Sequence, residues 1–145
     1  MKSGIFLKFW LPVFAWMIFI FGGSTDMLST EHTSRFIGPF LRWFAPHVSD
    51  ATIASIQLVV RKCGHLCEYA ILAGLLYRAL RPGIQRAAIG AFVVAAIYAA
   101  VDEFHQSFVA SRTGTPWDVL IDCVGAIAGL VFYGLARKRN GEGRA

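Results

Sequence analysis

The sequence predicts an all-α fold, an integral membrane four-helix bundle with an interfacial amphipathic segment between helices one and two. Of its 145 residues, 56% are hydrophobic and only 16% are charged, whereas soluble domains contain about 25% charged residues. The hydrophobic residues also gather in four runs, and one membrane span needs about 20 apolar residues. Four spans leave room for a single membrane domain over residues 1–145 and exclude a separate soluble catalytic domain.

The first predicted span covers residues 5–23 and follows a basic start. A basic start and a short apolar core also describe a cleavable signal peptide. Here the core ends in Phe21-Gly22-Gly23, and a bulky Phe is unsuited to a cleavage site, so we interpret the segment as a retained span. The other spans are predicted over residues 63–80, 87–104 and 119–136.

Residues 35–61 form the predicted interfacial segment. Four aromatic residues recur there at helical spacing: Phe36, Phe40, Trp43 and Phe44. Aromatic rings suit the headgroup level of a membrane. We expect Gly38-Pro39 to break the start of this helix, Pro46 to end it, and Ser49 to cap a further helix that runs into the second span. The segment is either a surface helix that covers the bundle or a lid over a site in the outer leaflet.

Lysine and arginine residues predict the orientation, because translocated loops carry fewer of them. Segments 1–8, 78–86 and 137–145 hold nine in 26 residues, whereas segments 24–62 and 104–117 hold five in 53. We therefore predict a multi-pass protein of the inner (cytoplasmic) membrane with both termini cytoplasmic. The net charge of +5 does not indicate nucleic acid as a partner, because the basic residues lie at chain ends and turns.

Ten polar or ionisable residues gather at the predicted outer ends of spans two, three and four. Ionisable groups inside a membrane cost about 2.5–3.5 kcal/mol each on insertion scales and are therefore candidates for function. We interpret four as candidate catalytic acid/base groups: His65, Glu68, Asp102 and His105. Six more are candidate substrate-binding residues: Lys62, Glu103, Gln106, Arg112, Asp118 and Asp122. The near balance of acids and bases predicts a paired network.

Helical phase predicts which of these side chains face inward. In span three, Glu103 lies to the side, and one face holds Asp102, His105 and Gln106. In span four, a single stripe holds Asp118, Asp122, Gly125 and Gly129. The two glycines form a Gly-xxx-Gly pattern, which lets a neighbouring helix approach closely. We assign this pattern to packing within the bundle.

Some of these residues also have a purely structural interpretation. Thr115-Pro116-Trp117-Asp118 has the pattern of a helix start, so capping alone can explain Asp118. Lys62 and Glu103 can equally lie at a rim in contact with water.

Metal and cysteine chemistry receive little support from the sequence. Two histidines and several carboxylates are suitable metal ligands, but no tight motif such as His-Glu-x-x-His is present. We therefore predict no metal ligands and leave any cofactor unassigned. Cys63, Cys67 and Cys123 are interpreted as small packing residues.

Three segments of the sequence resemble the VanZ family, which is named for a protein linked to teicoplanin resistance. They are Lys62-Cys-Gly-His65-Leu-Cys-Glu68-Tyr69, then Tyr98-Ala-Ala-Val-Asp102-Glu103-Phe-His105-Gln106, then Arg112 followed by Asp118, Asp122, Gly125 and Gly129. Their order matches the family pattern of Lys-x-x-His-x-x-Glu-Tyr, Asp-Glu-x-x-Gln and Arg-x5-Asp-x3-Asn/Asp-x2-Gly. Asp122 stands where the family often has Asn. The resemblance covers residues 61–134, about half of the chain.

The resemblance implies a small multi-span protein of the bacterial envelope, associated with lowered susceptibility to lipoglycopeptides. Teicoplanin carries a lipid tail and acts at the outer face of the membrane, where the polar residues of this chain are predicted to gather. We therefore predict an outer-leaflet polar pocket for an anionic amphiphile, with a membrane lipid or lipid-linked envelope precursor as the partner. Two alternatives stay open: an enzyme that modifies or hydrolyses a lipid-linked substrate, and a structural or proton-relay bundle. The oligomeric state stays open as well.

Overall fold

The computed structural model describes residues 3–25, 30–81, 86–109 and 114–142, and this part of the chain is helical and contains no strand. Along it follow the helices α1 (Ser3–Gly23), α2 (Thr30–Phe44), α3 (Asp50–Leu80), α4 (Ala87–Gln106) and α5 (Pro116–Glu142). The prediction of an all-α protein is confirmed.

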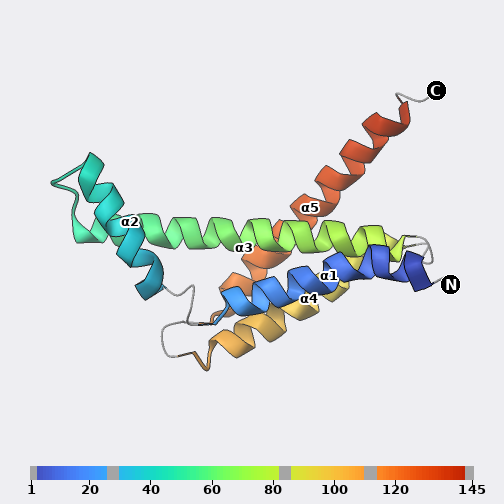
Figure 1. Ribbon diagram of the computed structural model, residues 1–145, viewed down its shortest axis with the longest axis horizontal. Coiled ribbons are helices and arrows are strands. Elements are labelled where there is room, and N and C mark those ends of the chain that lie inside the picture. Colours follow the sequence, from blue (N-terminus) through green and yellow to red (C-terminus); the bar gives the residue numbers. More distant parts are fainter. Residues whose placement is uncertain (1–2, 26–29, 82–85, 110–113, 143–145) are drawn as a thin grey trace.

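The central element of the arrangement is α3. It contacts each of the other four helices, and α4 and α5 also pack against each other. Figure 1 shows α1 and α4 running in one direction, with α3 and α5 running back. The first turn of α1 and the last turn of α5 therefore lie on the same side of the molecule, and the end of α4 lies near the start of α5.

Three helices are long and apolar enough to cross a membrane. The apolar segments are Phe6–Gly23 in α1, Ala87–Gln106 in α4 and Pro116–Arg139 in α5. They agree with three of the predicted spans. No such segment is found in α3, which carries Arg61, Lys62 and Glu68, so a four-helix bundle of membrane spans is not confirmed.

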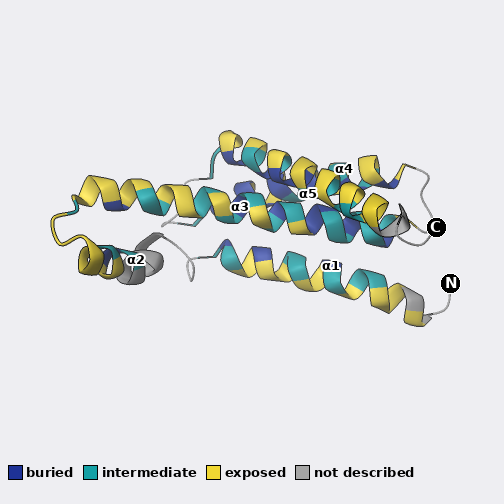
Figure 2. Ribbon diagram, turned by 90° about the horizontal axis from the view of Figure 1, so that it is seen from above, coloured by how far each residue is buried: buried dark blue, intermediate teal, exposed yellow. Residues whose placement is uncertain are grey.

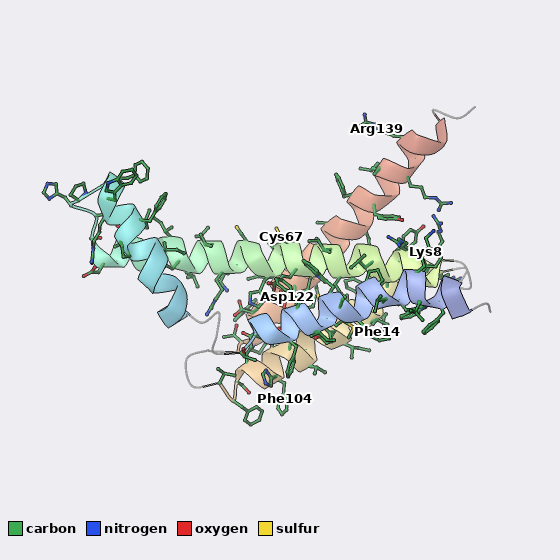
Figure 3. The ribbon with its side chains drawn as sticks, viewed as in Figure 1. Lys8, Phe14, Cys67, Phe104, Asp122 and Arg139 are labelled. Atoms are coloured by element: carbon green, nitrogen blue, oxygen red, sulfur yellow. The ribbon has the colours of Figure 1, made fainter. Side chains whose placement is uncertain are left out.

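Large apolar side chains cover the outward faces of the long helices. Figure 2 shows exposed residues along the outer faces and buried residues where the helices face one another. Phe14 on α1 and Phe104 on α4 point away from the other helices (Figure 3), and they are 49% and 68% exposed. Extended exposed apolar surfaces are rare on soluble monomers, and this one suits contact with lipid.

The predicted interfacial segment is divided between two helices. α2 ends at Phe44, just before Pro46, as expected. It runs through Gly38-Pro39, however, so the prediction that this pair breaks the helix is wrong. A proline lacks its own backbone donor but fits the helical φ angle, and α2 as a whole packs against α3.

Ser49 caps α3 as predicted, because its side chain accepts a hydrogen bond from the Thr52 backbone nitrogen at 3.2 Å. From this cap α3 runs without interruption for 31 residues to Leu80, which corresponds to a length of about 46 Å. An ion pair between Arg42 and Asp50 joins the end of α2 to the start of α3. The second part of the predicted interfacial segment is therefore the beginning of α3.

Small residues bring α5 close to α3. A methyl group added to Gly129 would lie 2.6 Å from the Ala70 Cα, and one added to Gly125 would lie 2.9 Å from the Leu66 Cα. These separations are too short for carbon atoms in contact, so the two glycines allow α5 to cross α3. The prediction that the Gly-xxx-Gly pattern serves packing within the chain is confirmed.

A stripe of alanines positions α4. Every fourth residue is buried, at Ala87, Ala91, Ala95 and Ala99. Asp102 and Gln106 continue the same face at the end of the helix and are buried too. The close packing of the alanines therefore carries polar side chains into the interior at one end of α4.

Candidate functional site

Polar side chains meet where α1 and α4 end and α5 begins, near the middle of α3 (Figure 1). We refer to eight of them as the polar cluster: Ser24, Lys62, His65, Asp102, Glu103, Gln106, Asp118 and Asp122. All except Lys62 are buried, and Asp122 lies where α5 crosses the other helices (Figure 3). Arg112, which we predicted as a binding residue, lies outside the described residues.

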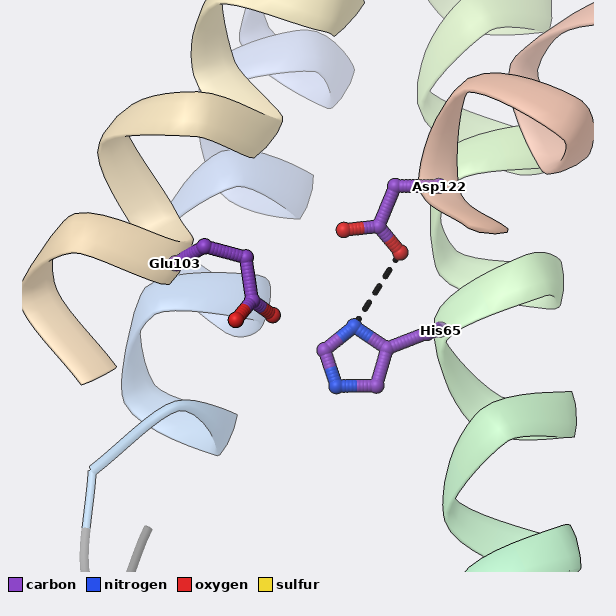
Figure 4. Close-up of side chains that lie close together, drawn as sticks. All are labelled: His65, Glu103 and Asp122. Atoms are coloured by element: carbon purple, nitrogen blue, oxygen red, sulfur yellow. Dashed lines mark hydrogen bonds and ion pairs between the residues drawn. The ribbon is translucent and has the colours of Figure 1, made fainter. Parts of the chain in front are cut away.

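Three side chains of the polar cluster converge from α3, α4 and α5. His65, Glu103 and Asp122 each offer one ligand atom, and these atoms lie within 4.8 Å of one another (Figure 4). The His65 Nδ1 and the Asp122 Oδ1 are 3.1 Å apart. Among the described residues, the Glu103 Oε1 and the Asp122 Oδ2 are buried without a hydrogen-bond partner. The geometry thus presents carboxylate oxygens able to accept a proton or bind a cation.

Lys62 lies at the edge of the polar cluster, one turn from His65. Its ammonium group donates a hydrogen bond to the Asp118 carboxylate, and the Arg61 guanidinium lies 4.0 Å from the second oxygen of that carboxylate. The Asp118 side chain is 7% exposed, whereas the Lys62 side chain is 34% exposed. Lys62 is therefore both the partner of a buried acid and a cation that other molecules can reach.

Glu103 connects the end of α4 to the start of α5. Its Oε2 accepts a hydrogen bond of 3.0 Å from the Thr115 backbone nitrogen. The Thr115 hydroxyl in turn accepts a bond of 3.3 Å from the Asp118 backbone nitrogen, so the predicted helix start is confirmed. Glu103 is 5% exposed and does not lie at a rim. Capping does not account for the Asp118 carboxylate, which bonds Lys62.

A second group of the polar cluster lies between α1 and α4. The Ser24 hydroxyl donates a 2.8 Å hydrogen bond to the Asp102 Oδ2, and the Gln106 amide donates to the same oxygen at 3.0 Å. The amide is also 3.2 Å from the Ser24 hydroxyl. We did not predict Ser24, because one serine after a Gly-Gly pair has no periodicity. It joins the site through the packing of α1.

Asp102 and Glu103 face different neighbours because consecutive helical residues point about 100° apart. Asp102 faces Ser24 after α1, and Glu103 faces His65 and Asp122 on the other two helices. Helical phase correctly predicted that these two carboxylates point in different directions. It did not show that each of them faces another part of the chain. Glu103 thus joins His65 although we had placed it to the side.

His105 and Glu68 are not members of the His65 group. The His105 ring packs against the Phe21 ring with centroids 4.4 Å apart. Glu68 is half-buried, and its backbone carbonyl accepts a 2.9 Å hydrogen bond from the Trp16 indole. Its charge still interacts electrostatically with His65. Of the four predicted catalytic candidates, Glu68 and His65 are therefore related by this electrostatic interaction, whereas Asp102 and His105 have other neighbours.

The cysteines are free, and the packing interpretation is wrong for two of them. Cys63 and Cys67 are exposed, and Cys123 is half-buried. Cys63 and Cys67 lie on a face of α3 that the described helices leave open, because they point away from His65 by roughly half a helical turn.

Acidic groups outnumber basic groups within the polar cluster. Four carboxylates are buried there: Asp102, Glu103, Asp118 and Asp122. The basic side chains of Arg61 and Lys62 both pair with Asp118. Among the described residues, His65 is thus the basic group that faces Glu103 and Asp122. Buried charges are costly unless paired, so the arrangement favours additional protons or a bound cation.

An apolar groove of about 430 Å³ lies between α3 and α5, closer to the C-terminal ends of both helices than the polar cluster. It is lined by Ala70, Ile71, Gly74, Leu75, Arg78, Ala128, Gly129, Phe132 and Tyr133. Ala70 follows Lys62 by eight residues, which is about 12 Å along the helix. The groove is open, and its one charged lining residue, Arg78, lies at the end remote from Lys62.

Comparison with known proteins identifies the family. A family model described as VanZ/LLP1 matches residues 9–137, most of the chain. The chain belongs to the VanZ/LLP1 family. The resemblance predicted from three segments is therefore confirmed, and the match also takes in most of α1 and all of α2. Family membership and three apolar helices together indicate a VanZ-like membrane protein. No curated protein and no solved structure matches the chain.

Proposed function

We propose that this VanZ-family protein binds the anionic headgroup of an amphiphile at its polar cluster. The observation that carries the proposal is the position of Lys62, a partly exposed cation at the edge of an otherwise buried polar network. A cation in this position meets a headgroup without the cost of exposing the buried carboxylates. The partner we propose is a lipid of the outer leaflet or a lipid-linked envelope precursor.

We propose a single domain with four membrane spans, in which α3 crosses the membrane in addition to α1, α4 and α5. α3 is 31 residues long and contacts α1, α4 and α5. Its buried face includes His65 and Tyr69, and such residues lower the apolar character of a helix without being exposed to lipid. The distribution of Lys and Arg supports an inner-membrane protein with both termini cytoplasmic. In that orientation the polar cluster would lie in the outer leaflet.

Lys62 can bind a headgroup while Asp118 keeps a partner. The ammonium group is a charge-assisted donor suited to a phosphate or carboxylate. When Lys62 turns towards a ligand, the Arg61 guanidinium is already 4.0 Å from the Asp118 carboxylate. Arg112, in the segment before α5, is the second cation that we propose for the headgroup.

The groove between α3 and α5 suits the acyl chain of the same molecule. It is lined mainly by apolar side chains and lies further along the two helices that carry Lys62 and Asp118. A headgroup near Lys62 would therefore leave its chain directed along Ala70 and Gly129 towards the middle of the membrane. The family association with teicoplanin, which also carries a lipid tail, is compatible with this arrangement.

Titration of the purified full chain with phosphatidylglycerol tests the proposal, with phosphatidylcholine as the zwitterionic comparison and native mass spectrometry as the readout. Lys62→Ala should weaken phosphatidylglycerol binding at least five-fold. Arg139→Ala removes the same charge from an exposed position on α5 and should leave binding unchanged. Equal losses in both variants, or equal binding of the two lipids by the wild type, would contradict the proposal.

The pair of His65 and Asp122 favours one alternative function, an enzyme that acts on a lipid-linked substrate. A histidine whose Nδ1 contacts a carboxylate is an arrangement used in general acid–base catalysis. This alternative predicts that the wild type forms product from lipid-linked substrates in nanodiscs and that His65→Ala does not. A third possibility, a structural or proton-relay bundle, predicts that the same variant lowers stability or proton flux while lipid binding by the wild type is absent.

A further inference from the structure

We propose that His65, Glu103 and Asp122 bind a divalent transition-metal ion. The inference goes beyond headgroup binding and does not depend on it, because it stands on the three side chains alone. It also departs from the expectation based on the sequence, in which no motif predicted metal ligands.

The three ligands come from three different helices and are separated by long stretches of chain. Their ligand atoms already lie within 4.8 Å of one another (Figure 4). Ligand atoms around a bound Zn²⁺ are about 3.4 Å apart, as follows from metal–ligand distances near 2.1 Å. Modest side-chain rotation therefore brings the three atoms into a coordination sphere.

Unpaired oxygen atoms provide a second, independent observation. Asp122 is fully buried and Glu103 is 5% exposed. In each carboxylate one oxygen is held by a hydrogen bond, from His65 or from the Thr115 backbone, and the other has no partner among the described residues. The Thr115 bond comes from outside the three-residue group and is of the kind that orients a metal ligand, whereas the contact between His65 and Asp122 joins two of the proposed ligands. The remaining oxygen atoms are the ones that a cation would satisfy.

The donor set indicates the class of ion. One imidazole and two carboxylates suit Zn²⁺ or Mn²⁺, whereas Mg²⁺ and Ca²⁺ take oxygen ligands. A divalent ion would also neutralise the Glu103 and Asp122 carboxylates that bind it. Three protein ligands leave at least one coordination position open. A phosphate bound at that position would link this site to headgroup binding, and this last step rests on the proposed function.

Metal content of the full-length purified protein tests the proposal. Cys63 and Cys67 are exposed thiols one turn apart, so the experiment uses a Cys63→Ser/Cys67→Ser background to remove an adventitious zinc site. Metal-stripped protein is dialysed against Zn²⁺, Mn²⁺ or Mg²⁺, and bound metal is measured by inductively coupled plasma mass spectrometry. We expect one Zn²⁺ or Mn²⁺ per chain and at least tenfold weaker binding in Glu103→Gln and Asp122→Asn.

His105→Ala is the matched control, because His105 packs against Phe21 outside the three-residue group, and it should bind metal as the wild type does. Thermal unfolding of the Cys-substituted parent with and without Zn²⁺ is a second readout that needs no site variant, and bound metal should raise its melting temperature. Absence of saturable binding, or binding unchanged in both carboxylate variants, would overturn the proposal. Phosphatidylglycerol titration in EDTA separates the two proposals, since headgroup binding by Lys62 should persist without metal.

Discussion

Glu103 at the end of α4 accepts a hydrogen bond from the Thr115 backbone nitrogen, immediately before α5 begins. In a capping box this bond is accepted by the acidic residue three positions into the helix, which here is Asp118. Because Glu103 accepts it instead, the Asp118 carboxylate is free to bond Lys62 on α3. Because Glu103 takes the place of Asp118 as the capping acceptor, these two carboxylates together connect α3, α4 and α5 at the polar cluster.

Removal of the Glu103 oxygen that accepts from Thr115 should destabilise the protein more than removal of the Glu103 charge alone. Glu103→Gln keeps an oxygen that can accept from Thr115, whereas Glu103→Ala removes it. We expect the alanine variant to be less stable than the glutamine variant by about 1 kcal/mol, the usual value of a helix cap. Thermal unfolding in detergent measures the difference, and equal stability of the two variants would show that the Thr115 bond contributes nothing.

Lys62 and Asp118 should show energetic coupling. Loss of one partner of a buried pair costs about 3–5 kcal/mol, but Lys62 is one-third exposed, so we expect about 1–2 kcal/mol for Lys62→Ala. The double variant Lys62→Ala/Asp118→Asn should lose less than the sum of the single variants, because it leaves no buried carboxylate that has lost its nearest cation and retains only Arg61 at 4.0 Å. Strict additivity in this double-mutant cycle would indicate that the pair does not form.

Gly129 should not tolerate even a methyl group. Gly129→Ala would force the new carbon to within 2.6 Å of the Ala70 Cα, and overpacking of this kind costs about 1–3 kcal/mol. Gly134→Ala lies on the same helix with no atom within 4 Å of the added carbon, so it should be neutral or slightly stabilising. The two melting temperatures provide the comparison, and a neutral Gly129→Ala would show that α3 and α5 are further apart.

Ser24→Ala should expose the role of α1 in the polar cluster. The variant removes the donor that lies 2.8 Å from the Asp102 carboxylate. Loss of a hydrogen bond to a buried group costs about 1–3 kcal/mol. Thr25→Ala is the matched control, because that hydroxyl bonds only locally to the Gly22 carbonyl. If both variants unfold at the same temperature as the wild type, α1 does not contribute to the cluster.

Cysteine accessibility tests the proposed orientation in the membrane. In a chain without native cysteines, Arg139→Cys lies near the end of α5 and Ala45→Cys follows α2. With both termini cytoplasmic, a membrane-impermeant maleimide added to intact spheroplasts should label the cysteine at 45 and not the one at 139. The reverse pattern would place the polar cluster in the inner leaflet and contradict the proposed function.

Periodicity and spacing predicted most of the helices and much of the site, because both properties are local. The Ser49 cap, the Gly125 and Gly129 crossing and the inward stripe with Asp122 all follow from residues within a few turns of one another. The run of apolar residues predicted α1 in the same way.

Features that depend on how helices meet could not be predicted from local patterns. The pairing of Glu103 with Thr115 and its convergence with His65 require α4 to pack against both α3 and α5. Ser24 acquires its role only through a contact with a residue 78 positions away. Helical phase gives the direction of a side chain, but it does not show which neighbour lies there.

The position of a bound headgroup is the most direct test of the central claim. An anionic phospholipid with a photoactivatable headgroup can be cross-linked to the purified protein in nanodiscs, and the modified peptides can be mapped by mass spectrometry. We predict cross-links around Lys62 and the start of α5, with loss of this signal in Lys62→Ala and retention in Arg139→Ala. Cross-links concentrated around Arg78, at the other end of the α3–α5 groove, would contradict the account.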